Sequence, residues 1–125
     1  MPRTSPITLW CILLTVLLTV IGQLLVKRGV QAMGPLPVHV DRWPAFVLQA
    51  FTRVPVLAGL CCSLLAAVTW VIALARAPLS FAYPFMSLAP VLTLALCGPL
   101  LQENVPWHRW LGVLLVCVGL VIAAR

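Results

Sequence analysis

Four polar side chains recur at every fourth position early in the sequence: Thr15, Thr19, Gln23 and Lys27. Residues four apart share one face of a helix, so this spacing predicts a polar stripe along a single helix. Hydroxyl and amide groups can replace the water that surrounds a sugar, and an ammonium group can bind a phosphate. The stripe therefore favours contact with a polar or anionic molecule. The alternative is that its threonines only hydrogen-bond to neighbouring helices.

Tyr83 and Ser87 form a second polar group, on a segment that also contains Pro84 and Pro90. Each proline removes a backbone donor and crowds the carbonyl one turn earlier, so we expect this helix to be kinked or locally open. Interrupted helices commonly build substrate sites in transporters. Trp70 should lie near Tyr83, either as an anchor at the membrane interface or as a substrate contact.

Charged residues stand at the ends of apolar segments rather than inside them. Lys27 and Arg28 follow the first such segment and Arg76 follows the second, so these cations are expected to contact phosphate groups near the two membrane faces. Glu103 stands just before the last apolar segment. We expect this carboxylate either to accept bonds from the first turn of the following helix or to pair with a cation. Candidate cations are a headgroup amine and the side chains of Lys27, Arg28 and Arg109.

The composition of the chain argues against a water-soluble domain. Of its 125 residues, 63% are hydrophobic and 8% are charged, whereas soluble domains average about 45–50% apolar and about 25% charged residues. The net charge of +6 is scattered between the apolar segments and forms no basic stripe. Membrane lipids with anionic headgroups are therefore the expected surroundings, and nucleic acid is not expected as a partner.

Four apolar segments are each long enough to cross a membrane as a helix. They cover residues 7–26, 56–75, 79–101 and 107–124. Because irregular backbone is costly in lipid, we expect an all-α membrane protein with four transmembrane helices in a single domain over residues 1–125. The last two connections are short, so neighbouring helices should be antiparallel and both termini should lie on one side. A signal peptide is the alternative for the first segment.

The first connection, residues 27–55, is much longer than the other two. Apolar residues recur there at three- and four-residue steps around Pro44, which predicts a short helix lying in the headgroup plane. A disordered proline-rich loop is the alternative.

Orientation in the membrane is only weakly encoded. The side that holds the termini carries Arg3, Arg76 and Arg125, and the opposite side carries Lys27, Arg28, Arg42, Arg53 and Arg109. This excess favours the second side as cytoplasmic, although insertion in both orientations stays open.

The last apolar segment carries small residues along one stripe, formed by Gly112, Val116, Gly119 and Ala123. Small residues let helix backbones approach closely, so the stripe predicts a contact surface. The spacing does not distinguish a neighbouring helix of the same chain from a second subunit.

Features of enzymes and of cofactor sites are missing from the sequence. It has no pair of acidic residues, no glycine-rich phosphate loop and no plausible trio of serine, histidine and aspartate. The five cysteines lie within apolar segments without the spacing of a metal site. We therefore expect neither catalysis, nor a cofactor, nor a metal ion.

A resemblance to a known family is carried by four blocks of sequence. They are Gly22-Gln23-Leu24-Leu25-Val26-Lys27, then Ala82-Tyr83-Pro84-Phe85-Met86-Ser87-Leu88, then Glu103, and finally Trp110-Leu111-Gly112 with Gly119. The chain resembles the small four-helix members of the drug/metabolite transporter superfamily, which are EamA-like or similar to the small multidrug exporters. In particular it resembles the subunits of the aminoarabinose-phosphoundecaprenol flippase.

This resemblance implies a transporter subunit in the bacterial inner membrane that moves a polyprenyl-phosphate-linked sugar between leaflets. It also implies an antiparallel homodimer, or a heterodimer with a related four-helix subunit, joined through the helix of Gly112 and Gly119. The alternative is an exporter of small cations or metabolites of the small multidrug type. Such exporters carry a membrane glutamate where this chain has Thr19, and a tryptophan where it has Met86. These differences weigh against proton-coupled export of cations.

Overall fold

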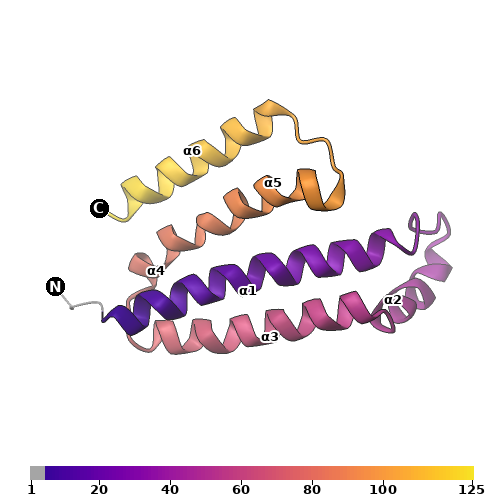
Figure 1. Cartoon of the computed structure of the whole chain (residues 1–125), viewed down its shortest axis with the longest axis horizontal. Helices are drawn as coiled ribbons and strands as arrows, with labels where there is room; N and C mark the ends of the chain where they lie inside the picture. The colour runs from indigo at the N-terminus through magenta and orange to yellow at the C-terminus, as the bar shows by residue number, and fades with distance from the viewer. Residues whose placement is uncertain (1–4) are drawn as a thin grey trace.

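Every regular element of the part that the computed structural model describes, residues 5–125, is helical (Figure 1). The elements in chain order are α1 (Pro6–Gln31), the short 3₁₀ helix η1 (Val40–Arg42), α2 (Trp43–Phe51), α3 (Val54–Leu74), α4 (Leu79–Met86), α5 (Leu88–Leu101) and α6 (Trp107–Ala123). The all-α prediction is confirmed. Arg3, one of the cations used to predict orientation, lies outside the described residues.

Three segments of the described chain are long and apolar enough to cross a membrane. They are α1 with 26 residues, α3 with 21, and the 23 residues of α4 and α5 taken together. The fourth predicted span corresponds to α6, a shorter apolar helix of 17 residues. The first turn of α1 and the last turn of α6 lie at the same end of the bundle, and the connection between α1 and α3 lies at the other (Figure 1).

Helix α1 continues one and a half turns beyond the predicted end at residue 26. Lys27 and Arg28 therefore extend the helix instead of starting a loop, because both are good helix formers and their long side chains can reach the headgroups. The chain leaves the helical path near Gly34, whose φ of +85° lies in the left-handed region that glycine tolerates. As a result, Lys27 keeps its register with the polar stripe of α1.

Helices α1 and α3 pack through glycines. A Cβ atom on Gly22 would lie 2.8 Å from both the Gly59 carbonyl oxygen and the Ser63 hydroxyl. Farther along, a Cβ on Gly29 would lie 2.6 Å from a methyl group of Val56. Close backbone approach of this kind is typical of membrane helices, where dispersion contacts replace the hydrophobic effect as the driving force. The spacing of these glycines in the sequence did not predict that they pack α1 against α3.

The third predicted span is divided at Ser87 into α4 and α5. Pro90 cannot donate to the carbonyl of Met86, the last residue of α4, and its ring crowds that carbonyl. At the break, the Ser87 hydroxyl donates to the Pro84 carbonyl at 2.5 Å. The predicted local opening of this helix is therefore confirmed, at the residue between the two prolines.

The long first connection contains η1 and α2, so the predicted short helix is present. Pro44 lies in the first turn of α2, where a missing N–H costs nothing. The indole of Trp43 donates to the Pro37 carbonyl at 2.9 Å and ties the loop to this helix. Its position in the headgroup plane stays a prediction.

Helix α6 is loosely attached to the rest of the bundle. It packs beside α4 and α5 (Figure 1), and none of its residues from Trp107 to Ala123 is buried. A Cβ atom on Gly112 or Gly119 would meet nothing within 4 Å. These glycines are therefore open to the surroundings, unlike those of α1 and α3.

Candidate functional site

The polar stripe of α1 faces a pocket of about 280 Å³ between α1, α3 and α4. We call it the Thr19 pocket; it is lined by Thr15, Thr19, Gln23, Ser63, Ala66, Ala67, Trp70 and Met86. Small side chains on α3 leave the space open opposite the stripe. Polar groups in a membrane helix are expected to face the interior of the bundle. Thr15 is buried there, Thr19 is partly buried, and Gln23 lines the pocket from an exposed position.

The hydroxyls of the Thr19 pocket already have short hydrogen bonds inside the protein. Thr15 is buried, and its hydroxyl lies 2.8 Å from the Cys11 carbonyl and 2.7 Å from the Thr69 hydroxyl. Thr19 donates to the Thr15 carbonyl at 2.7 Å. Thr15 thus links α1 to α3. For this residue, the alternative that the stripe threonines hydrogen-bond to neighbouring helices is the one observed.

A second polar pocket, of about 230 Å³, adjoins the first at Gln23. We call it the Glu103 pocket; its lining residues are Gln23, Leu24, Lys27, Thr93, Cys97, Leu101 and Glu103. The Thr93 hydroxyl of α5 lies 3.5 Å from the side-chain oxygen of Gln23. Because Gln23 lines both pockets, the polar stripe runs without interruption from Thr15 to Lys27. Thr93 was not among the predicted site residues, since nothing in its own segment marks it as facing α1.

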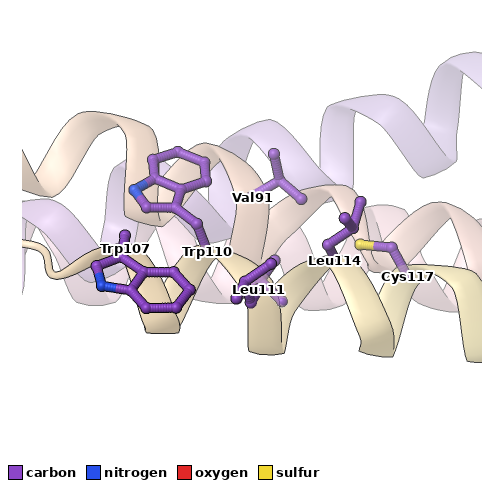
Figure 2. Close-up of a pocket in the computed structure, with 7 residues that line it drawn as sticks. Val91, Trp107, Trp110, Leu111, Leu114 and Cys117 are labelled. Atoms are coloured by element: carbon purple, nitrogen blue, oxygen red, sulfur yellow. The ribbon is translucent and has the colours of Figure 1, made fainter.

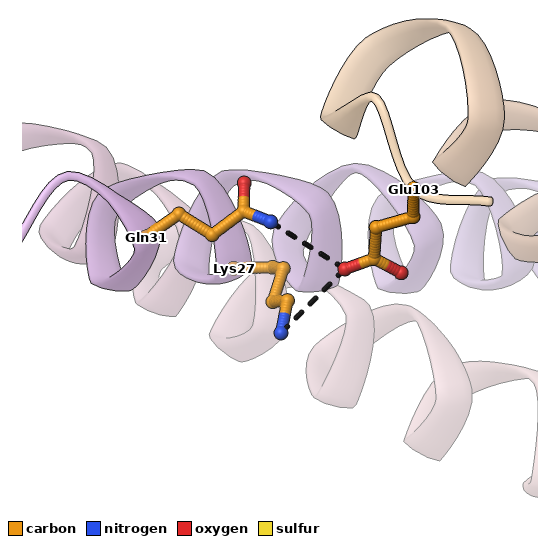
Figure 3. Close-up of polar contacts among 3 residues, drawn as sticks. All are labelled: Lys27, Gln31 and Glu103. Carbon is orange, nitrogen blue, oxygen red and sulfur yellow. Dashed lines mark hydrogen bonds and ion pairs between the residues drawn. The ribbon is translucent and has the colours of Figure 1, made fainter. Parts of the chain in front are cut away.

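Glu103 pairs with the end of α1 (Figure 3). Its Oε1 atom lies 3.6 Å from the Lys27 ammonium and accepts a 3.4 Å bond from the amide of Gln31. The backbone of Gln102 adopts a left-handed conformation with φ of 55° at the end of α5, where the chain reverses direction. The expectation that Glu103 caps the last helix is wrong, because α6 begins after Pro106 without a side-chain cap. The ion pair, the other expectation, is present.

The remaining predicted cations do not join this pair. Arg28 lines an apolar groove of about 220 Å³ between α1 and α5. Arg109 lines a cleft between α5 and α6. Arg76 is exposed in the link from α3 to α4, at the end of the bundle where α1 begins. The structure therefore brings Lys27 together with Gln23 and Glu103, and leaves Arg76 at the opposite end.

Trp70 and Tyr83 are in direct contact. Their rings meet edge to face with centroids 6.3 Å apart, and Trp70 also lines the Thr19 pocket. Tyr83 is about half exposed beside it and lines neither polar pocket. Ser87 is buried at the break between α4 and α5, where its carbonyl accepts a bond from the Cys117 thiol. Its hydroxyl donates to the Pro84 carbonyl within the helix break.

Two apolar clefts separate α5 from α6. The larger, of about 510 Å³, is lined by Val91, Trp107, Trp110, Leu111, Val113, Leu114 and Cys117. Figure 2 shows the two indole rings at the end where α6 begins. The smaller, of about 380 Å³, includes Gly112 and Val116 of the small-residue stripe together with Arg109. Gly119 and Ala123 lie on the exposed surface of α6. The clefts were not predicted, because their residues differ in no way from ordinary lipid-facing ones.

Within residues 5–125, no three histidine, cysteine or acidic side chains gather in a way that could hold a metal ion. The polar groups that meet in space are hydroxyls, amides and one ion pair. Such an arrangement can bind a polar molecule by hydrogen bonds and charge.

Apolar helices of membrane-spanning length, packed through glycines beside two pockets with polar side chains, define a multi-pass helical membrane protein. The chain belongs to the EamA-like transporter family, whose sequence profile matches residues 39–125. The resemblance found in the sequence is thereby confirmed.

Several relatives share this family and cover most of the chain. A protein of Shewanella sediminis, named a probable 4-amino-4-deoxy-L-arabinose-phosphoundecaprenol flippase subunit ArnF, is 35% identical over 87% of this chain and 81% of its own. A probable ArnE subunit of the same flippase from Aeromonas hydrophila is 34% identical over 89% of this chain and 91% of its own. Another ArnE, of Pseudomonas fluorescens, is 32% identical over 94% and 97%. No solved structure matches the chain significantly.

Proposed function

We propose that this protein is a subunit of a flippase in the bacterial inner membrane, which moves a polyprenyl-phosphate-linked sugar between the two leaflets. The observation that carries the proposal is the unbroken polar wall of α1, from Thr15 to Lys27, along two adjoining pockets. The names of the relatives specify a substrate with an amino sugar, a phosphate and a polyprenyl chain. Each of these three parts has a chemical counterpart in the fold.

The headgroup has donors to replace its water. Gln23 and Thr93 supply an amide and a hydroxyl, and Lys27 supplies a positive charge for the phosphate. The hydroxyls of Thr15 and Thr19 are engaged in short bonds, so they shape the deeper pocket more than they offer free donors. The headgroup would therefore enter beside Lys27 and pass Gln23 toward the Thr19 pocket.

The polyprenyl tail would stay in lipid while the headgroup crosses. The larger cleft between α5 and α6, which contains none of the small-residue stripe, is almost wholly apolar and is large enough to receive part of such a chain. Trp107 and Trp110 stand at the end where α6 begins, and tryptophan favours the boundary between headgroups and acyl chains. A loosely attached α6 provides the lateral opening that a lipid substrate needs.

Helix α6 would serve as the fourth crossing and as the surface for a partner. Its 17 residues span about 26 Å, slightly less than the roughly 30 Å of a hydrocarbon core. The stripe of Gly112, Val116, Gly119 and Ala123 is uncovered by the rest of the chain. We propose that it packs against a second copy or a related four-helix subunit in an antiparallel arrangement.

The alternative function is export of small cations, as in the small multidrug exporters. A cation in the middle of a membrane needs a carboxylate nearby. Among the residues that line the two polar pockets, Glu103 is the one carboxylate, and it lies at the end of the bundle in contact with Lys27. The arrangement favours a phosphate-bearing lipid over a simple cation.

Ligand-induced thermal stabilisation in detergent tests this proposal, because a ligand that binds only the folded state raises its melting temperature. Polyprenyl phosphate sugar should stabilise the protein, and a quaternary ammonium compound should not. Gln23→Ala should lose the stabilisation. Gln49→Ala, which changes the same residue type in the exposed part of α2, is the matched control. Stabilisation by the ammonium compound alone would support the exporter, and stabilisation by neither would contradict both functions.

A further inference from the structure

The polar contacts of the Glu103 pocket are all long. Lys27 and Glu103 are 3.6 Å apart, Gln31 and Glu103 are 3.4 Å apart, and Thr93 and Gln23 are 3.5 Å apart. Full-strength hydrogen bonds from nitrogen to oxygen measure about 2.7–3.2 Å. The side chains of this pocket are partly exposed and lie near one another without forming strong bonds.

The contrast with the adjoining Thr19 pocket is direct. There the Thr15 and Thr69 hydroxyls are 2.7 Å apart, and Thr19 lies 2.7 Å from the Thr15 carbonyl. A ligand that bound to these hydroxyls would have to break well-formed hydrogen bonds within the protein. In the Glu103 pocket, the same exchange loses only weak ones, since a bond of 3.5 Å or more contributes little. The groups around Glu103 are thus the ones available to a ligand.

The charges of this pocket are not those of a plain anion site. Lys27 attracts a phosphate, but Glu103 stands on the same wall and repels it. Both Glu103 contacts use Oε1, so Oε2 has no partner among the described residues. A headgroup that carries an amine as well as a phosphate would satisfy both side chains. Its phosphate would take the place of Glu103 beside Lys27, and its ammonium group would take the place of Lys27 beside Glu103. A headgroup with a phosphate alone would leave the carboxylate facing a second negative charge.

We infer that Glu103 determines headgroup specificity by binding an ammonium group on the sugar while Lys27 binds the phosphate. This inference rests on the proposed flippase function and assigns the selection step to one residue. The pair of Lys27 and Glu103 opens when such a headgroup enters and closes after it leaves. Carrier lipids without the amine, including the bare polyprenyl phosphate, bind more weakly because the carboxylate repels their phosphate.

The test compares binding of three probes to the purified full-length protein in detergent. They are a polyprenyl phosphate carrying an amino sugar, the same lipid with its amine N-acetylated, and bare polyprenyl phosphate. The wild type should bind the amino form about tenfold more tightly than the acetylated one, which is the scale of one charge-assisted hydrogen bond. Glu103→Gln should bind all three with similar affinity, and Glu103→Asp should keep the order of preference. Lys27→Gln should weaken binding of all three.

The outcomes separate this inference from the function on which it rests. Equal binding of the amino and acetylated lipids by the wild type would overturn the role of Glu103 and leave the flippase proposal standing. A preference that survives in Glu103→Gln would also overturn the inference. Failure of all three lipids to bind the wild type would contradict the flippase proposal itself. Retained melting temperatures in the variants, measured without ligand, confirm that they are folded.

Discussion

Gly59 of α3 lies against Gly22 of α1 so closely that a Cβ on Gly59 would stand 2.6 Å from the Gly22 carbonyl oxygen. The obstacle is backbone, which cannot rotate away. Gly59→Ala should therefore lower the free energy of unfolding by about 1–3 kcal/mol, the usual cost of overpacking. Thermal unfolding in detergent measures this change.

Gly98→Ala in α5 is the matched control for that substitution. A Cβ at Gly98 meets only one atom within 4 Å, at 3.9 Å, which is an ordinary contact. The same replacement should leave stability unchanged or raise it slightly, because alanine is the better helix former. Equal melting temperatures for the two variants would contradict the close packing of α1 and α3.

The exposed stripe of α6 should mediate association and contribute little to folding of the single chain. Gly112→Leu should lower the dimer fraction, because a large side chain prevents close approach of a partner helix. A Cβ there meets no other atom of the chain, so the monomer should remain folded. Sedimentation in detergent, with the protein alone and with a related subunit, measures the association.

Val121→Leu is the control for the stripe, since residue 121 lies on the opposite side of α6 and is exposed. It should leave association intact. Loss of the dimer in this variant and not in Gly112→Leu would place the interface on the other face.

Replacing Gln23 by alanine together with Tyr83 by phenylalanine should strongly slow flipping of a labelled lipid in vesicles. Gln23 belongs to both polar pockets, and Tyr83 contacts Trp70 at the wall of one of them. Rates should fall at least about tenfold, the effect of losing one good hydrogen bond to a charged group. Dimer formation should persist, and a variant that still flips at the wild-type rate would exclude these side chains from the path.

Transport should depend little on a proton gradient. The two acidic residues of the sequence, Asp41 and Glu103, lie outside the apolar parts of the spans, so no carboxylate deep in the membrane can carry a proton. Flux into vesicles should follow the lipid gradient after an ionophore collapses the proton gradient. If the flux stops when the proton gradient is collapsed, transport is coupled to protons and the prediction is wrong.

The sequence predicted the elements of the fold because apolar length and proline position act locally. The stripe of α1 and the break beside Pro90 both follow from spacing within one segment. The close contact of Gly22 with Gly59 could not be predicted in this way, because the spacing of glycines on one helix does not reveal which other helix packs against them. The position of Glu103 depended on the left-handed turn at Gln102, which few residues other than glycine adopt. Contacts between distant segments, such as Gln23 with Thr93, therefore emerged only from the structure.

Photo-crosslinking of a lipid substrate tests the central claim most directly. A polyprenyl phosphate sugar with a photoreactive headgroup is bound to the protein, and the labelled peptides are identified by mass spectrometry. The polar wall of α1 predicts labels on the segment around Gln23 and Lys27 and on α5 around Thr93. Labels confined to the lipid-facing surface of α3, for example at Leu64 and Leu65, would show that the headgroup never enters the bundle.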